Sequence, residues 1–508
     1  MDEFSHAWYR ARLVEADEVY REELGRPLVG TGDVEGVSLR MFQQREHGHN
    51  RAALVRSVRD SAEWRLRQPA PPDPPVLDTP SAPMAPPLPP LAGQLRFDGV
   101  SFADNTGRRV PLALHLGDLA MCYVEGKEVL VHEALADARD AGYQIVRIWL
   151  TINWRHPHPF WGGRTLSPAT TPDYHRRMTE FLRIVAEDYG LQLHVTLGDS
   201  FQVSHAEEDA LWHWLKFLVR DHPTWFALIE GLNEAYGTGD RDDWDPAEIE
   251  RQIRIVRTLN PSHLYALSAA AGENSESVEE LVRWTPALMP FFYYHAYRGG
   301  HWFDQMRHVF SLVYEHGGTV RRNGWSGEPP GVNLRSYYDG ATGPGAWVSG
   351  MDHPEEWTAQ RYALYLAHTA MSRQLPTFMC SHGVKLEGRL RDVPGFVEAP
   401  RLIAHLPPNV MAYDELFHGG QTFADRRVLV ADDDELRIDH AHNTATGDLV
   451  MTVYGPSRDR TYTIPIERPW RGRMVAGGVV QENVELVPGR TLPVVMGDGA
   501  LLVGRRIA

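Results

Sequence analysis

The stretch Trp225-Phe-Ala-Leu-Ile-Glu-Gly-Leu-Asn-Glu-Ala-Tyr-Gly237 begins as a mainly apolar run and ends in polar residues and a glycine. Short apolar runs closed by Gly or Pro are typical of buried β-strands. Seven similar runs begin at Pro111, Gln144, Leu191, Leu264, Phe291, Gly324 and Pro376. A helical stretch, or a loop leading into one, follows each run. Eight alternating units predict a parallel sheet that closes into a barrel.

An open, doubly wound sheet is the alternative arrangement for such a pattern. Its first turn should carry a Gly-rich phosphate-binding motif, and this sequence has none there. We therefore predict an α/β catalytic domain over residues 93–407 with the (β/α)8 TIM-barrel fold. Within it, Leu95-Arg-Phe-Asp-Gly-Val-Ser-Phe102 and Asn105-Thr-Gly-Arg-Arg-Val110 predict a hairpin that closes the bottom of the barrel.

The composition changes on either side of the barrel region. Residues 1–67 place apolar positions at helical spacing, which predicts an N-terminal helical module. Residues 68–92 include Pro69-Ala-Pro-Pro-Asp-Pro-Pro75, a composition typical of an extended linker or of a strap laid against the next domain. Residues 408–508 contain short alternating runs such as Leu449-Val-Met-Thr-Val-Tyr454, which predict a C-terminal antiparallel β-sandwich.

The formal net charge is −16 at pH 7. Nucleic acids and anionic membranes bind clustered positive charge, so this balance disfavours both as partners and is compatible with a neutral carbohydrate. No apolar run approaches the roughly 20 residues that a membrane span needs. The first residues, Met1-Asp-Glu-Phe-Ser-His6, lack the pattern of a secretory signal. We expect a soluble chain. The sequence does not fix its location, and extracellular and particle-associated locations both stay open.

The chain has two cysteines, Cys122 and Cys380, and therefore no disulfide framework. The barrel prediction places them at the ends of the first and last strands, which are neighbours. A bridge between them is one alternative, and two buried free thiols are the other, which we favour.

Two glutamates stand where strand runs give way to turns. Glu234 follows Asn233 in the opening stretch, and Glu328 lies in Gly324-Trp-Ser-Gly-Glu-Pro-Pro-Gly331. Barrel enzymes form their active sites at the carboxyl ends of the strands. A carboxyl pair there is what retaining glycoside hydrolysis needs, because one group protonates the leaving oxygen while the other attacks the anomeric carbon. The pair therefore predicts a retaining glycosidase.

Side chains alternate between the lumen and the exterior along a barrel strand. On the second predicted strand Arg147 and Trp149 share a face, and on the third His194 and Thr196 share one. An arginine inside a barrel needs a carboxylate beside it, and Glu328 is the partner we expect; the arginine would keep it ionised. We count Arg147 and His194 among the candidate substrate-binding residues. A structural ion pair for Arg147 and an ordinary core histidine for His194 are the alternatives.

Aromatic and histidine side chains are expected around the same end of the barrel. His295 and Tyr297 point the same way on the sixth predicted strand, and Trp154 and Trp161 lie in predicted top loops. Flat aromatic rings stack on the apolar faces of sugars. These residues are therefore candidates for substrate binding, although tryptophans also fill large cores.

These residues carry a resemblance to a known family. Glu230-Gly-Leu-Asn-Glu-Ala-Tyr-Gly237 resembles the fourth-strand motif of the retaining glycoside hydrolases of clan A, family 5 in particular. Val146-Arg-Ile148 resembles that family's second-strand motif, His295-Ala-Tyr297 its sixth-strand pair, and Gly327-Glu328 its seventh-strand nucleophile. The resemblance covers roughly residues 93–400.

The resemblance implies a role for each matched residue. Asn233 would contact the substrate, Glu234 would be the acid/base, Tyr297 would lie near the nucleophile, and Glu328 would be the nucleophile. The eighth strand departs from the family pattern, because Phe378-Met-Cys-Ser-His-Gly383 lacks the usual tryptophan. His382 is the residue that could stand in for it.

A second resemblance concerns only the N-terminal region. Val19-Tyr-Arg-Glu-Glu-Leu-Gly-Arg26 and Ser61-Ala-Glu-Trp64 resemble a small helical domain of unknown function found in bacterial surface and secreted proteins. The resemblance implies a module that attaches the chain to another protein or surface.

Two other functions compete with a glycosidase. One is an envelope- or virus-particle-associated protein whose barrel binds glycan with or without cleaving it. The other is a metal-dependent hydrolase, which is disfavoured because His115 stands alone at the end of the first strand. His156-Pro-His158 and Asp432-Asp-Asp-Glu435 lack the spacing of a defined metal site. We therefore expect no metal and no cofactor.

Overall fold

The computed structural model of this chain describes residues 95–97, 101–152, 164–199, 205–233, 264–266, 292–294, 324–326, 359–379, 389–393, 395–418, 437–454, 469–487 and 499–507. The chain divides into two compact units, Met1–Pro86 and Pro87–Ala508. All described residues belong to the second unit. The helical module predicted for residues 1–67 lies outside the described residues.

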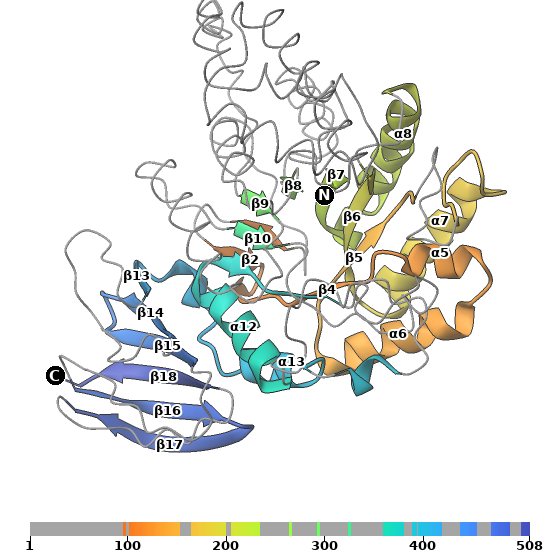
Figure 1. Ribbon diagram of the computed structural model, residues 1–508. Helices are drawn as coiled ribbons and strands as arrows, with labels where there is room; N and C mark the ends of the chain where they lie inside the picture. The colour runs from red at the N-terminus through yellow and green to blue at the C-terminus, as the bar shows by residue number, and fades with distance from the viewer. Residues whose placement is uncertain are drawn as a thin grey trace, which may run out of the picture. The chain divides into compact units, whose positions relative to one another are not determined.

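A strand is present in each of the eight predicted runs. They are β4 (Ala113–His115), β5 (Ile145–Trp149), β6 (Gln192–Asp199), β7 (Phe226–Asn233), β8 (Leu264–Ala266), β9 (Phe292–Tyr294), β10 (Gly324–Ser326) and β12 (Thr377–Met379). Figure 1 labels β4 to β10. Every residue of β5 is buried, as expected for a parallel strand that is covered on both faces.

The described barrel strands form two parallel sheets. Six strands follow the order β12-β4-β5-β6-β7-β8, and three follow β11-β10-β9. The short strand β11 (Gln374–Leu375) pairs with β10, and β12, which begins two residues later, pairs with β4. The strands thus follow one another in chain order and the last lies beside the first, as in a (β/α)8 barrel. Between β8 and β9 the described residues form no ladder.

The described helices lie between these strands and after them. They are α5 (Leu119–Val124), α6 (Glu128–Ala141), α7 (Tyr174–Arg183), α8 (His205–Asp221), α12 (Ala359–Met371) and α13 (Glu398–Ile403). A π-helical turn, Ile184–Asp188, extends α7. At the end of α6, Gly142 takes a left-handed conformation with φ of 100°, which lets the chain turn sharply into β5.

The predicted hairpin before the first barrel strand is confirmed. It is an antiparallel arrangement of β1 (Arg96–Phe97), β2 (Phe102–Asp104) and β3 (Gly107–Arg108). Phe102 is fully buried in the same apolar cluster as the barrel core.

The C-terminal region forms one six-stranded antiparallel sheet among the described residues. Its order is β13 (Glu415–His418), β14 (Arg437–Asn443), β15 (Asp448–Tyr454), β18 (Ala500–Arg506), β16 (Trp470–Ala476) and β17 (Val479–Leu486). A second sheet, which the predicted sandwich requires, is not among the described residues, so that part of the prediction is not tested.

The sheet packs on the barrel through α12. Ala441, Val450 and Leu501 of the sheet belong to the same buried cluster as the barrel residues. In this contact His368 Nε2 of α12 lies 2.6 Å from Asp439 Oδ2 of β14, and both side chains are fully buried. One face of the sheet therefore shares its core with the barrel, while buried residues such as Leu449, Met451 and Leu502 form a separate cluster.

Cys122 corrects one prediction. It lies in α5, beyond the end of β4, because the chain turns into a helix as soon as the first barrel strand ends. The thiol is free and buried, and burial raises its pKa to about 12. Cys122 is therefore a buried free thiol, while Cys380 lies outside the described residues.

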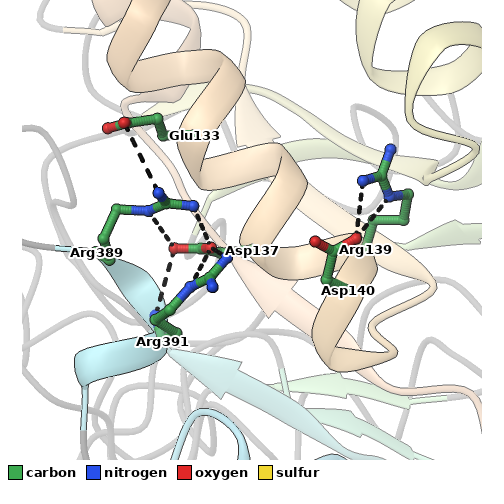
Figure 2. A network of polar contacts seen from close by, with 6 residues as sticks. All are labelled: Glu133, Asp137, Arg139, Asp140, Arg389 and Arg391. Carbon is green, nitrogen blue, oxygen red and sulfur yellow. Dashed lines mark hydrogen bonds and ion pairs between the residues drawn. The ribbon is translucent and has the colours of Figure 1, made fainter.

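A buried carboxylate fastens the chain after the last barrel strand to the first long helix (Figure 2). Asp137 of α6 accepts hydrogen bonds from Arg389 Nε at 3.0 Å and Arg389 Nη2 at 2.6 Å, and from Arg391 Nε at 2.7 Å. Burial alone would raise the pKa of Asp137, but the two guanidinium groups outweigh it and hold that pKa below the ordinary value. This contact ties the end of the barrel to its beginning.

We expect Asp137→Asn to lower the free energy of unfolding by about 1.5–3 kcal/mol, the range for hydrogen bonds to charged groups. Asp140→Asn is the matched control, since Asp140 lies on the same helix in an exposed pair with Arg139, and should cost less than about 1 kcal/mol. Because the folded-state pKa of Asp137 is lowered, its stabilisation is present above the unfolded pKa near 3.8 and is lost as the pH falls below it. Denaturant titrations at pH 7 and pH 3 measure both effects, and equal losses for the two variants would contradict the role of Asp137.

Candidate active site in the barrel

Four neighbouring strands place polar side chains on one buried layer. The pairing sets His115 of β4 beside Arg147 of β5, Arg147 beside His194 of β6, and Thr196 beside Glu230 of β7. All five side chains are buried, the most exposed of them at 1%. The predicted common face of Arg147 and Trp149, and of His194 and Thr196, agrees with this register.

Glu230 is the centre of the layer. Its Oε2 atom accepts from Arg147 Nη2 at 2.9 Å, from Arg147 Nε at 3.1 Å, and from the hydroxyl of Thr196. His194 Nε2 lies 3.1 Å from the same oxygen. Because a carboxylate only accepts, this contact places a proton on Nε2 of His194. The carboxylate of Glu230 therefore links β5, β6 and β7.

His115 completes the layer on the other side of the arginine. Its Nδ1 lies 3.1 Å from Arg147 Nη1. A guanidinium only donates, so Nδ1 must accept, and the proton of the neutral ring is on Nε2. A Cβ atom at Gly117 would lie 2.8 Å from that Nε2, so the close approach of the backbone to His115 requires glycine.

The buried polar layer neutralises the positive charge of Arg147. Arg147 keeps its charge at any ordinary pH, and a buried charge without a partner is strongly destabilising. The sequence correctly required a carboxylate beside Arg147, but the expected partner was Glu328. The described partner is Glu230, and Glu328 lies outside the described residues. Sequence analysis did not identify Glu230 as the partner of Arg147, although Glu230 stands inside the quoted motif.

For the remaining predicted site residues, the structure describes only the strands that precede them in the chain. Asn233 is the last residue of β7 and pairs with Asp199, the last residue of β6. Seven predicted residues lie outside the described ones: Glu234, Glu328, His295, Tyr297, Trp154, Trp161 and His382. Of the predicted site residues, the structure therefore brings together Arg147 and His194. The positions of the other side chains remain predictions.

Neither a metal site nor a membrane span emerges from the described part of the chain. Within it, no group of three or more His, Cys, Asp or Glu side chains is arranged to hold a metal ion. None of its helices is long and apolar enough to cross a membrane. A pocket of about 480 Å³ lies at the amino ends of β4 and β5, lined by Leu112, Gln144 and Arg401 among others, and so belongs to the opposite end of the strands from Asn233.

Solved structures similar to this chain include three enzymes. The endo-1,4-beta-mannanase from Eisenia fetida has 11% identity and a TM-score of 0.41, over 62% of this chain and 97% of that one. The maltogenic alpha-amylase from Thermotoga neapolitana has 7% identity and a TM-score of 0.45, over 78% and 98%. The alpha-galactosidase from Lactobacillus brevis has 8% identity and a TM-score of 0.44, over 79% of this chain and only 55% of its own length.

The chain matches no protein-family model, and a sequence comparison with curated proteins gives no match. The case for a function therefore rests on the residues and the sheet topology of this chain.

Proposed function

We propose that this chain is a retaining glycoside hydrolase that cleaves a β-linked glycan, with Glu234 as acid/base and Glu328 as nucleophile. The observation that carries the proposal is where two parallel strands end. β7 ends at Asn233, directly before Glu234, and β10 ends at Ser326, two residues before Glu328. Both glutamates thus follow the carboxyl ends of barrel strands, where barrel enzymes carry their catalytic groups.

The proposed reaction is a double displacement. The Glu328 carboxylate attacks the anomeric carbon while the Glu234 carboxyl gives its proton to the leaving oxygen, which releases the first product and forms a glycosyl ester on Glu328. The Glu234 carboxylate then removes a proton from water as the water attacks the anomeric carbon. The ester bond breaks, the second product leaves, and both side chains return to their starting states.

The other candidate residues have two proposed roles: some hold the strands in place, and the others contact the substrate. In the proposal, the buried contacts among Arg147, Glu230 and His194 hold β5, β6 and β7 in register below the active site. In the proposal Asn233 contacts the sugar and Tyr297 lies beside the nucleophile. Further substrate contacts are assigned to His295, His382, Trp154 and Trp161. No cofactor takes part in this chemistry.

The distance between the two carboxyl groups, measured by crystallography, tests the geometry that the proposal needs. Retention requires the carboxyl groups of Glu234 and Glu328 to lie about 5 Å apart. A separation of about 9 Å would indicate inversion instead. A separation above about 12 Å would rule out both carboxylates as one catalytic pair.

We expect Glu234→Ala to be rescued by azide on substrates with good leaving groups. Such substrates need no protonation in the first step, and azide replaces the water that lacks its general base in the second. The product should be a β-glycosyl azide, identified by NMR. Absence of rescue, with damage equal to that of Glu328→Gln, would contradict the assigned roles.

A second candidate function is glycan adsorption by a surface- or particle-associated protein. The division of the chain into two compact units near the Pro-rich segment favours this context, because the first unit could serve for attachment. Deleting residues 1–92 should then leave activity on a soluble substrate unchanged and abolish only attachment. An insoluble truncated chain would show that the Pro-rich segment belongs to the barrel surface.

A further inference from the structure

Helix α12 is buried along nearly its whole length. Every residue from Arg361 to Met371 is buried. A helix in the outer ring of a barrel usually keeps a polar face in water, whereas a helix that is buried all round needs a cover on each side. The apolar residues of α12 belong to the same cluster as the barrel strands, so the barrel covers one side. Another element must cover the other side.

The C-terminal sheet supplies this second cover with one of its faces. Strands β14, β15 and β18 contact α12. Side chains alternate between the two faces along each strand. The residues on one face belong to the apolar cluster of the barrel and include Ala441, Val450 and Leu501. Residues next to these in the sequence form the separate cluster and include Leu449, Met451 and Leu502. One face of the sheet is therefore committed to the barrel.

A buried polar contact fixes this face of the sheet to α12. His368 Nε2 lies 2.6 Å from Asp439 Oδ2, and both side chains are fully buried. Because a carboxylate only accepts, His368 donates through Nε2. Asp439 is two residues before Ala441 on β14, so both residues are on the face that covers the helix. Burying a carboxylate is costly unless donors surround it, so this bond favours the state in which sheet and helix are together.

A second buried contact fixes the turn that follows α12. Arg373 stands between α12 and β11 in the left-handed conformation, with φ of 63°, which is uncommon for a residue other than glycine and needs support from its surroundings. Its exposed fraction is 5%, and its Nη2 donates a hydrogen bond to the carbonyl of Tyr413, just before β13. A buried guanidinium needs acceptors. The chain that enters the sheet supplies one of them.

Both contacts act on the segment that links the last barrel strands to the first. After the turn at Arg373, β11 pairs with β10 and β12 pairs with β4. These strands are only two and three residues long, so their ladders contain few backbone hydrogen bonds. The position of this segment therefore depends on the packing of α12, which precedes it, and so on the cover that the sheet gives to α12.

We propose that the C-terminal sheet is an internal brace of the barrel: it holds α12 and, through α12, the strands β11 and β12. The sheet is a structural part of the barrel and not a separate binding module that can open away from it. Barrel and sheet accordingly fall within one compact unit, Pro87–Ala508. The brace does not depend on the proposed glycosidase activity.

Hydrogen–deuterium exchange of the full chain in increasing urea, read by mass spectrometry at constant pH, tests the brace. Peptides that cover residues 359–379, from α12 to β12, and residues 437–454, in β14 and β15, should lose protection at the same urea concentration. The reason is that opening either region exposes the core of the other. Loss of protection in 437–454 at lower urea, while 359–379 stays protected, would overturn the proposal.

A pair of variants separates the brace from a general loss of stability. Without urea, Asp439→Ala should speed exchange of residues 374–379, in β11 and β12, at least about threefold, although Asp439 itself lies in the sheet. Asp448→Ala is the matched control, because Asp448 lies in the same sheet and binds the exposed Arg505 at 2.8 Å, so residues 374–379 should exchange as in the wild type. Unchanged exchange of 374–379 in Asp439→Ala, or equally faster exchange in both variants, would contradict the brace. If Asp439→Ala fails to fold by circular dichroism, the urea series of the wild type decides the question.

Discussion

The Glu328→Gln variant is expected to lose turnover on every glycoside that the wild type hydrolyses. A neutral amide cannot form the glycosyl ester, so neither a good leaving group nor added azide bypasses the defect. We expect a fall in kcat on the order of 10⁴-fold or more, as for the loss of a covalent nucleophile in other enzymes. Initial rates on aryl β-glycosides, for the variant and the wild type at equal concentration, measure the effect.

The matched control for this variant is Glu133→Gln. Glu133 is an exposed residue of α6 whose nearest partner, Arg389, lies 3.8 Å away, so its activity should equal that of the wild type. Binding of the glycan should survive in Glu328→Gln, since the fold is unchanged. Residual turnover within tenfold of the wild type would show that Glu328 is not the nucleophile.

Arg147→Met should destabilise the barrel by about 3–5 kcal/mol, the cost of leaving a buried partner uncompensated. The carboxylate of Glu230 would keep Thr196 and His194 as partners but would lose its only guanidinium in the described layer. Chemical denaturation of the full chain measures the free energy of unfolding. Arg183→Met is the control, because its ion pairs with Glu180 and Asp188 are at the surface and should contribute far less to stability.

A double substitution shows whether the loss comes from the unpaired charge. Adding Glu230→Gln to Arg147→Met removes the buried charge and should restore part of the stability. The opposite result is a loss in free energy of unfolding of the double variant that equals the sum of the losses of the two single variants. That result would mean that the two side chains act independently, contrary to the described contacts.

Local patterns were enough to find the barrel strands. Every one of the eight runs contains a strand, because a parallel strand buried on both faces needs an apolar run, which is visible in the sequence by itself. Cys122 was misplaced, since the point at which β4 gives way to α5 depends on how the chain turns at Gly117 and Asp118. The C-terminal prediction identified antiparallel strands but not their shared core with α12, which depends on contacts between residues far apart in the chain.

The site was harder to predict than the fold. Strand parity correctly placed Arg147, His194 and Thr196 on one face, because parity is a property of each strand alone. The partner of Arg147 was not predictable in the same way, since it depends on the register between strands. That register sets Thr196 opposite Glu230 and so brings Glu230 to the guanidinium.

Trapping of the covalent intermediate tests the central claim most directly. The full chain is incubated with activated 2-fluoro aryl β-glycosides from a panel of sugars, and the peptides are then mapped by mass spectrometry. The account predicts a single glycosyl adduct on Glu328, its absence in Glu328→Gln, and retained anomeric configuration in products from ordinary substrates. An adduct on another residue, an inverted product, or binding of a glycan without cleavage or trapping of any panel member would contradict it.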